Sequence, residues 1–147
     1  MLFLTSKEVI MQECLNLLRH IHITLKSEFN RALDELGLTL PQLEVLSVLK
    51  RAEEGLLLKE VEQRIHVAQS TTTGIVSRME QKGLVSLCPD PKDRRAKCVR
   101  ITDEGRALTE RAAIQMKETG DRLFSSLSET EMEILRTLLQ KMADNLS

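Results

Sequence analysis

Apolar residues along this chain recur mostly at the spacing of an α-helix. From Ile10 to Leu36 they return every three or four positions, which predicts one helix of about 30 residues, ~45 Å long. Thr5 and Glu8 form a capping-box pair at its start, and Gly37 provides its end. A helix of this length exceeds the width of a small domain, so we expect its apolar face to pack against a partner chain as well.

Shorter elements follow. The spacing of apolar residues remains helical except around residues 84–101, where it becomes typical of β-strands. Thr39 followed by Gln42 is a second helix start, and Thr102 and Ser128 precede the last two helices. Two short apolar runs on either side of a basic, turn-forming segment predict a β-hairpin. The expected order is helices over 39–52, 59–65 and 70–82, strands over 84–88 and 97–101, and helices over 103–127 and 129–146.

Composition agrees with packed helices. The 147 residues include three Phe and no Tyr or Trp, so the core must consist of Leu, Ile, Val, Met and Ala, which suits helices better than a β-sandwich. No apolar run approaches the roughly 18 residues of a membrane span, and the N-terminus does not resemble a signal peptide. We therefore expect a cytoplasmic protein with no membrane contact, mainly α with a small β-wing.

Positive charge is concentrated in one part of the chain. The net charge is −1, but Lys59 to Arg106 holds ten Lys and Arg against seven Asp and Glu, a local charge of +3. The stretch from Lys92 to Arg100 has five basic residues and one acidic residue. A local basic cluster of this kind neutralises phosphates, so residues 57–102 are the expected DNA-binding part.

The two short helices over 59–65 and 70–82 have the spacing of a helix-turn-helix. In such a motif the second helix enters the major groove, and its N-terminal residues meet the base edges. Short hydrogen-bonding side chains occupy that end here, and a basic residue further along would reach a phosphate. The predicted contacts from this helix are Gln69, Ser70, Thr71, Thr72, Thr73 and Arg78.

The hairpin between residues 84 and 101 provides a second set of contacts. Arg94 and Arg95 lie at its tip, where they suit insertion into a minor groove, whose negative potential attracts arginine. Lys92 and Lys97 would lie along the DNA backbone. Asp93 is unexpected on such a tip unless it orients one of the arginines.

The run TTTGIVSRMEQKGLV and the segment DPKDRRAKCVRITDEGR, in this order of helices, resemble the MarR family of transcriptional regulators. The resemblance implies an obligate homodimer with a winged helix-turn-helix lobe over 37–103 and a helical dimerisation region over 1–36 and 104–147. It also implies a pseudo-palindromic operator in double-stranded DNA and repression that a small-molecule or oxidant effector relieves. A winged-helix module that binds another protein instead of DNA is the alternative.

An effector pocket, if present, would lie between the first helix, the second helix and the base of the lobe. We expect apolar lining there from Leu17, Ile21 and Leu46. The phenolic-ligand pockets of the family often include Tyr or Trp, which this chain lacks. His20 and His22 are two positions apart and cannot easily share a metal ion, so no metal or cofactor is expected.

The three cysteines are expected to be free thiols in a reducing compartment. Cys14 lies on the apolar face of the first helix, where some members of the family hold a peroxide-sensing cysteine, and we expect it to be buried and inert. Cys88 and Cys98 should lie nearly opposite each other on the hairpin, where oxidation could join them. No phosphate loop or nucleophile–His–acid set is visible, so an enzyme is not expected.

Overall fold

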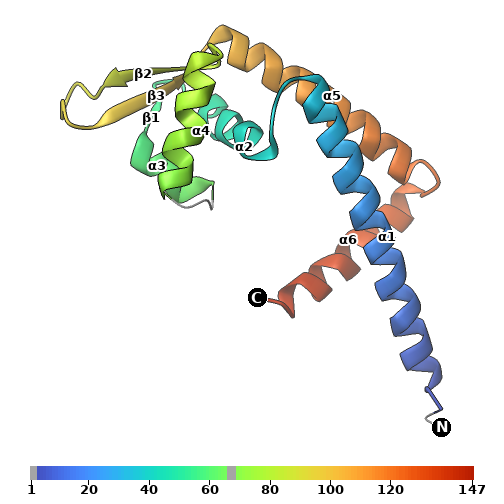
Figure 1. Cartoon of the computed structure of the whole chain (residues 1–147). Helices are drawn as coiled ribbons and strands as arrows, with labels where there is room; N and C mark the ends of the chain where they lie inside the picture. Colours follow the sequence, from blue (N-terminus) through green and yellow to red (C-terminus); the bar gives the residue numbers. More distant parts are fainter. Residues whose placement is uncertain (1–2, 66–68) are drawn as a thin grey trace.

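The computed structural model describes residues 3–65 and 69–147, and these form six helices and one three-stranded sheet (Figure 1). The predicted mainly helical fold with a small β-wing is confirmed. No helix in the described ranges is long and apolar enough to cross a membrane. The elements are α1 (Ser6–Glu35), α2 (Leu40–Lys50), β1 (Leu56–Leu57), α3 (Leu58–Arg64), α4 (Gln69–Gln81), β2 (Val85–Pro89), β3 (Lys97–Ile101), α5 (Asp103–Phe124) and α6 (Glu129–Asp144).

Side-chain caps fix the starts of the long helices, as the sequence predicts. At α1 the backbone N–H of Thr5 donates to Glu8 Oε2 at 2.6 Å, and Glu8 N–H donates back to the Thr5 hydroxyl. Reciprocal boxes of the same kind begin α2 and α6. Gly37, with φ of 68°, ends α1 in the left-handed conformation that favours glycine. Local sequence therefore sets these boundaries.

The sheet contains one strand more than the sequence predicts. β3 lies in the centre, with β2 and the short β1 antiparallel on either side. Leu56 of β1 pairs with Val99, and Leu87 of β2 pairs with the same residue from the other edge. β1 has two residues, too few to show a strand period in the sequence, and it exists because β3 offers it an edge.

One hydrophobic core unites α2, α3, α4 and the sheet into a lobe. Its largest fully buried side chains include Leu46 and Leu49 of α2, Val61 of α3 and Met79 of α4. The core also reaches the C-terminal end of α1, through Leu33, and the first half of α5. The lobe is therefore packed onto one end of each long helix (Figure 1).

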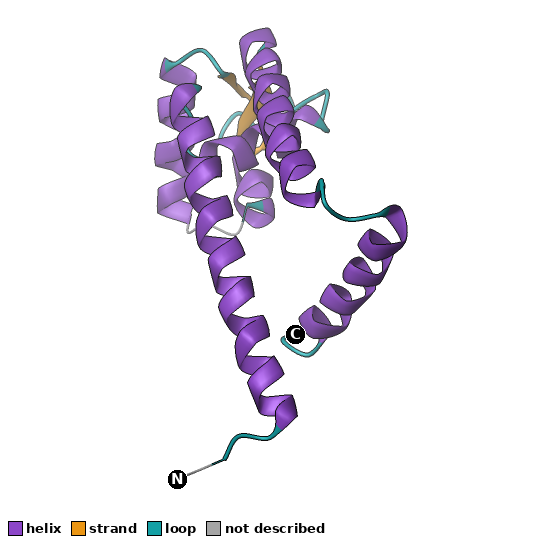
Figure 2. Ribbon diagram, turned by 90° about the vertical axis from the view of Figure 1, so that its right-hand side faces the viewer, coloured by secondary structure: helices purple, strands orange, loops and turns teal. Residues whose placement is uncertain are grey.

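The remaining helical segments extend away from the lobe. The N-terminal half of α1 and the whole of α6 project beyond it in both views (Figures 1 and 2). α6 has no buried residue, although it begins with a good cap and carries apolar positions along one face. The large apolar side chains left exposed on these segments include Ile10, Met11, Leu17, Ile21, Ile134, Leu138, Leu139 and Met142.

The start of α5 is joined closely to the sheet. Thr102 caps α5 by accepting from Gly105 N–H at 3.1 Å, and its own hydroxyl donates to the Gly83 carbonyl at 2.6 Å. Gly105 is buried here, and a Cβ at this position would overlap the Leu84 carbonyl oxygen and lie 2.9 Å from Ile101 Cγ1. Close contact between helix and sheet at this point therefore requires glycine.

Replacing Gly105 with alanine should destabilise the protein by about 1–3 kcal/mol, because the added methyl group would force α5 off the sheet. Gly120→Ala is the matched control on the same helix, since a Cβ there meets nothing within 4 Å. That control should be neutral or stabilising by up to about 1 kcal/mol, the helix-propensity difference. Urea unfolding measures both, and equal stability of the two variants would contradict the close packing at Gly105.

Candidate nucleic-acid interface

The two faces of α4 have different roles. Ile75, Val76 and Met79 are buried, and they hold the helix against α2 and α3. Thr71 and Thr73 in the first two turns are exposed on the other side. A short helix held by one apolar face and presenting a polar face to solvent has the form that the major groove admits.

The predicted base-contacting residues do not all lie on that exposed face. Gln69 and Ser70 begin α4, but their side chains lie outside the described residues. Thr72 is completely buried, so the prediction that it contacts DNA is wrong. Its distance of three, four and seven positions from the buried residues of α4 places it on the inner face, a signal already present in the sequence.

Arg78 lies one turn after Gly74 on α4. It is exposed, and its Nη2 atom lies 3.6 Å from the position that a Cβ on Gly74 would occupy. The guanidinium therefore extends back over the glycine, toward the N-terminal end of the helix. The absence of a side chain at Gly74 leaves room for this conformation.

Hydrogen bonds from two aspartates shape the tip of the wing. Asp90 Oδ1 accepts from Lys92 N–H at 3.3 Å, and Asp93 Oδ1 accepts from Arg95 N–H at 3.0 Å. The backbone closes with Asp90 N–H donating to the Ala96 carbonyl at 2.9 Å. Asp93 therefore forms part of the turn, which accounts for an acidic residue on a basic tip.

Arg94, Arg95 and Lys97 of the wing line a hollow that α4 also borders. Lys92, Arg94, Arg95 and Lys97 are all exposed. A surface hollow of about 310 Å³ lies between the wing and α4, lined by Glu80, Leu87, Cys88, Pro89, Arg94, Arg95, Ala96 and Lys97. The wing arginines and α4 are thus neighbours on the lobe.

A turn that the sequence analysis missed anchors the wing. Arg100 Nε donates to the Glu54 carbonyl at 3.0 Å, and the Cys98 thiol donates to the same oxygen at 3.8 Å. Gly55 has φ of 88°, and a Cβ there would lie 2.6 Å from Arg100 Cγ. This turn precedes β1 and α3, so it connects the wing to the helix-turn-helix.

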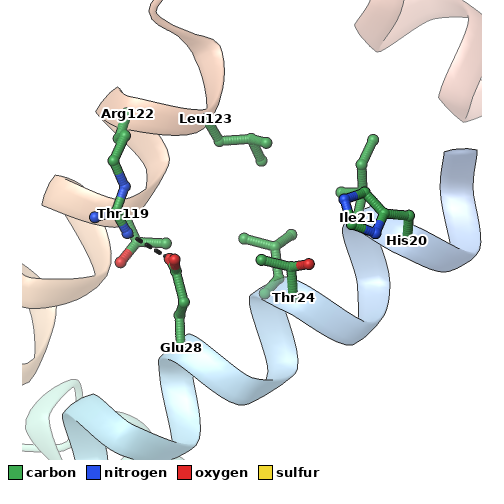
Figure 3. Close-up of a pocket in the computed structure, with 8 residues that line it drawn as sticks. His20, Ile21, Thr24, Glu28, Thr119, Arg122 and Leu123 are labelled. Carbon is green, nitrogen blue, oxygen red and sulfur yellow. Dashed lines mark hydrogen bonds and ion pairs between the residues drawn. The ribbon is translucent and has the colours of Figure 1, made fainter.

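The three residues predicted to line an effector pocket do not line one site, so that prediction is wrong as a set. Leu46 is fully buried in the lobe core, whereas Leu17 is 62% exposed on the projecting half of α1. Ile21 lines a cavity of about 250 Å³, but between α1 and α5 (Figure 3). The lining residues are His20, Ile21, Thr24, Leu25, Glu28, Thr119, Arg122 and Leu123.

An ion pair crosses one end of this cavity. Arg122 Nη2 of α5 lies 2.5 Å from Glu28 Oε2 of α1, as the dashed line in Figure 3 marks. The same two side chains border a smaller, polar hollow of about 190 Å³, which Gln115 also lines. Within the described residues, Gln115 Oε1 is buried and has no hydrogen-bond partner. The pair therefore separates an apolar space from a polar one.

The cysteines lie partly as predicted. Cys88 and Cys98 are directly opposite each other on β2 and β3, which confirms the predicted register. Cys14 is exposed on the chain, so the prediction that it is buried is wrong for a single copy. It lies on the half of α1 that projects beyond the lobe.

A helix-turn-helix followed by a β-wing defines the winged helix-turn-helix class of DNA-binding proteins. The chain belongs to the MarR family of this class, whose sequence pattern matches residues 36–96. The transcriptional repressor IacR of Pseudomonas putida is 32% identical over 129 residues, which cover 88% of this chain and 77% of IacR. The chain is accordingly a DNA-binding transcription regulator and not an enzyme.

Solved structures agree with this assignment. The crystal structure of YusO from Bacillus subtilis superposes with a TM-score of 0.85 at 29% identity, covering 95% of this chain and 99% of YusO. A mutant of Staphylococcus aureus MepR bound to an oligodeoxyribonucleotide gives a TM-score of 0.68 at 27% identity, covering 90% of this chain and 96% of MepR. The likeness to both extends through the long terminal helices as well as the lobe.

Proposed function

We propose that the protein is a cytoplasmic, homodimeric repressor that binds a pseudo-palindromic operator in double-stranded DNA and is released by an effector. The observation that carries the proposal is the position of the wing beside α4. One hollow is lined by Glu80, near the C-terminal end of α4, and by Arg94 and Arg95, so the wing lies beside the helix whose N-terminal end we propose reads the major groove. The similarity to IacR, a transcriptional repressor, supports repression rather than activation.

Within this surface the residues divide into two roles. Gln69, Ser70, Thr71 and Thr73 are the proposed base-contacting residues, since they occupy the N-terminal end of α4. Arg78, Lys92 and Lys97 are the proposed phosphate contacts, and Arg94 and Arg95 enter the minor groove. Thr72 is excluded because it is buried.

The dimer follows from the apolar surface outside the lobe. Residues 1–36 and 104–147 form the proposed dimerisation region, because α1 and α6 leave aliphatic side chains in water that a second copy can bury. Two lobes held in this way meet successive major grooves, which lie ~34 Å apart along B-DNA. A palindromic operator matches the twofold symmetry of such a dimer.

Substituting both Arg94 and Arg95 with alanine should weaken binding to the intergenic DNA beside the protein's own gene by at least about tenfold. The slope of log affinity against log salt should also fall, by roughly two to four for a dimer, because fewer counterions are released. Fluorescence anisotropy across a salt series measures both quantities.

Arg111→Ala combined with Lys117→Ala is the control, since it removes two exposed cations from α5, outside the wing. This control should leave the affinity within about twofold of the parent protein, as distant surface charges contribute little at physiological salt. An operator affinity insensitive to loss of the wing arginines would favour the protein-binding module instead.

The cavity between α1 and α5 is the proposed effector site. Most of its exposed wall surface is apolar. The Arg122 guanidinium lies at one end, and a guanidinium can bind a carboxylate through two parallel hydrogen bonds. A volume of about 250 Å³ suits a small organic acid with a single ring. A bound carboxylate would compete with Glu28 for Arg122, and so alter the contact that holds α1 to α5.

Benzoate and hydroxybenzoates are the simplest probes of this site. We expect at least one of them, at millimolar concentration, to lower operator affinity, and Arg122→Gln to abolish that response. Lys117→Gln is the control, since Lys117 forms an exposed ion pair with Asp121 on the same helix, away from the cavity. A response that persists in Arg122→Gln, or no response to any of these acids, would contradict the proposed site and ligand class.

A further inference from the structure

Two thiols face each other across the wing, at the base of its DNA-contacting tip. Cys88 of β2 and Cys98 of β3 are antiparallel partners, and Cys88 Sγ lies 3.7 Å from the Cys98 carbonyl oxygen. Directly opposed residues have Cα atoms roughly 4.5–5.5 Å apart, within the range of about 4.4–6.8 Å that a disulfide spans. Both cysteines are free thiols here. The backbone therefore already has the spacing that a disulfide needs.

The two thiols differ in their surroundings. Cys98 is buried against the Glu54–Gly55 turn, and this burial raises the pKa of its thiol, with a further contribution from Cys88. Cys88 is partly exposed and lines the hollow that Arg94, Arg95 and Lys97 share with Glu80. A partly exposed thiol among basic side chains is the setting in which cysteines react with oxidants.

We propose that Cys88 and Cys98 form a redox pair that lowers DNA affinity when it is oxidised by a hydroperoxide. Cys88 gives up its thiol proton and its sulfur attacks one peroxide oxygen. The O–O bond breaks, Cys88 becomes a sulfenic acid, and the other oxygen takes up the proton and leaves as water or an alcohol. The Cys98 sulfur then attacks Cys88, the S–O bond breaks, and the hydroxyl leaves with the Cys98 proton as water. The disulfide has lost two electrons to the peroxide, and a dithiol reductant restores both thiols.

The effect on DNA follows from what the Cys98 sulfur contacts when reduced. Its thiol donates to the Glu54 carbonyl, in the turn that leads into α3, and Arg100 Nε of the same strand donates to that oxygen as well. In the disulfide this donor is lost, and the sulfur must rotate from the turn toward Cys88. The wing is then cross-linked within itself but held less firmly to the helix-turn-helix, so the tip that carries Arg94 and Arg95 is less firmly placed beside α4. This step rests on the proposed DNA-binding role of the wing.

The test uses the whole 147-residue chain with Cys14→Ser, so that Cys88 and Cys98 are its remaining cysteines. Hydrogen peroxide treatment, alkylation of free thiols and non-reducing peptide mass spectrometry should reveal residues 88 and 98 joined, about 2 Da lighter than the reduced pair. Operator affinity should fall about tenfold in the same sample and return with dithiothreitol. Cys98→Ser should instead stop at an oxidised, unjoined Cys88, which a sulfenic-acid reagent would trap.

Two results would overturn the proposal. One is alkylation of both thiols after peroxide treatment, which would show that the pair does not oxidise. The other is a disulfide that forms with no change in operator affinity. Failure of the reduced protein to bind the operator would overturn the DNA-binding proposal instead, while mass spectrometry would still decide whether the cysteines pair.

Discussion

The main constraint on this structure is that α1 and α6 leave a large apolar surface exposed to water. Leu17 is 62% exposed, Ile134 54% and Leu138 51%, and no residue of α6 is buried. Burying one aliphatic side chain of this size contributes about 1.5–3 kcal/mol. α6 has its own cap but no core of its own, and an isolated helix of this length is marginal in water. In the dimer proposed above, a second copy of the chain would supply the missing surface.

Helix α5 links the exposed helical segments of α1 and α6 to the DNA-contacting lobe. α5 belongs to both, because its first turn is fixed to the sheet at Gly105 while its C-terminal half reaches α1 through Arg122 and Glu28. In the proposed dimer, a change in how α1 meets α5 would therefore alter the angle at which each lobe is held. The proposed effector cavity lies between α1 and α5, whereas the proposed thiol pair lies in the wing, on the lobe itself.

Much of the fold could be predicted from local sequence. Capping pairs such as Thr5 with Glu8 set helix starts through contacts three residues apart, and the spacing around the hairpin tip placed Cys88 opposite Cys98. β1 was not predicted because two residues are too few to show the alternation of apolar and polar positions that marks a strand. It forms where β3 provides hydrogen bonds. These boundaries depend on neighbours in sequence, while β1 depends on a neighbour in space.

The functional site was predictable in outline, but individual side chains were not. Thr72 was grouped with its polar neighbours, although helical spacing from Met79 puts it on the buried face. Leu17 and Leu46 are both apolar, and only tertiary packing shows that Leu46 of α2 lies in the lobe core and Leu17 of α1 outside it. Composition indicates which residues can bind or pack, whereas tertiary contacts decide which do.

Sedimentation equilibrium of the free protein, compared with a Leu138→Glu plus Met142→Glu variant, tests the central claim most directly. The parent chain should sediment as a dimer of about twice its 16.7 kDa mass at micromolar concentration. The variant should dissociate and lose operator affinity, although both substitutions lie in α6 and outside the lobe. A parent protein that is monomeric at these concentrations, and that binds its operator as one chain, would contradict the account.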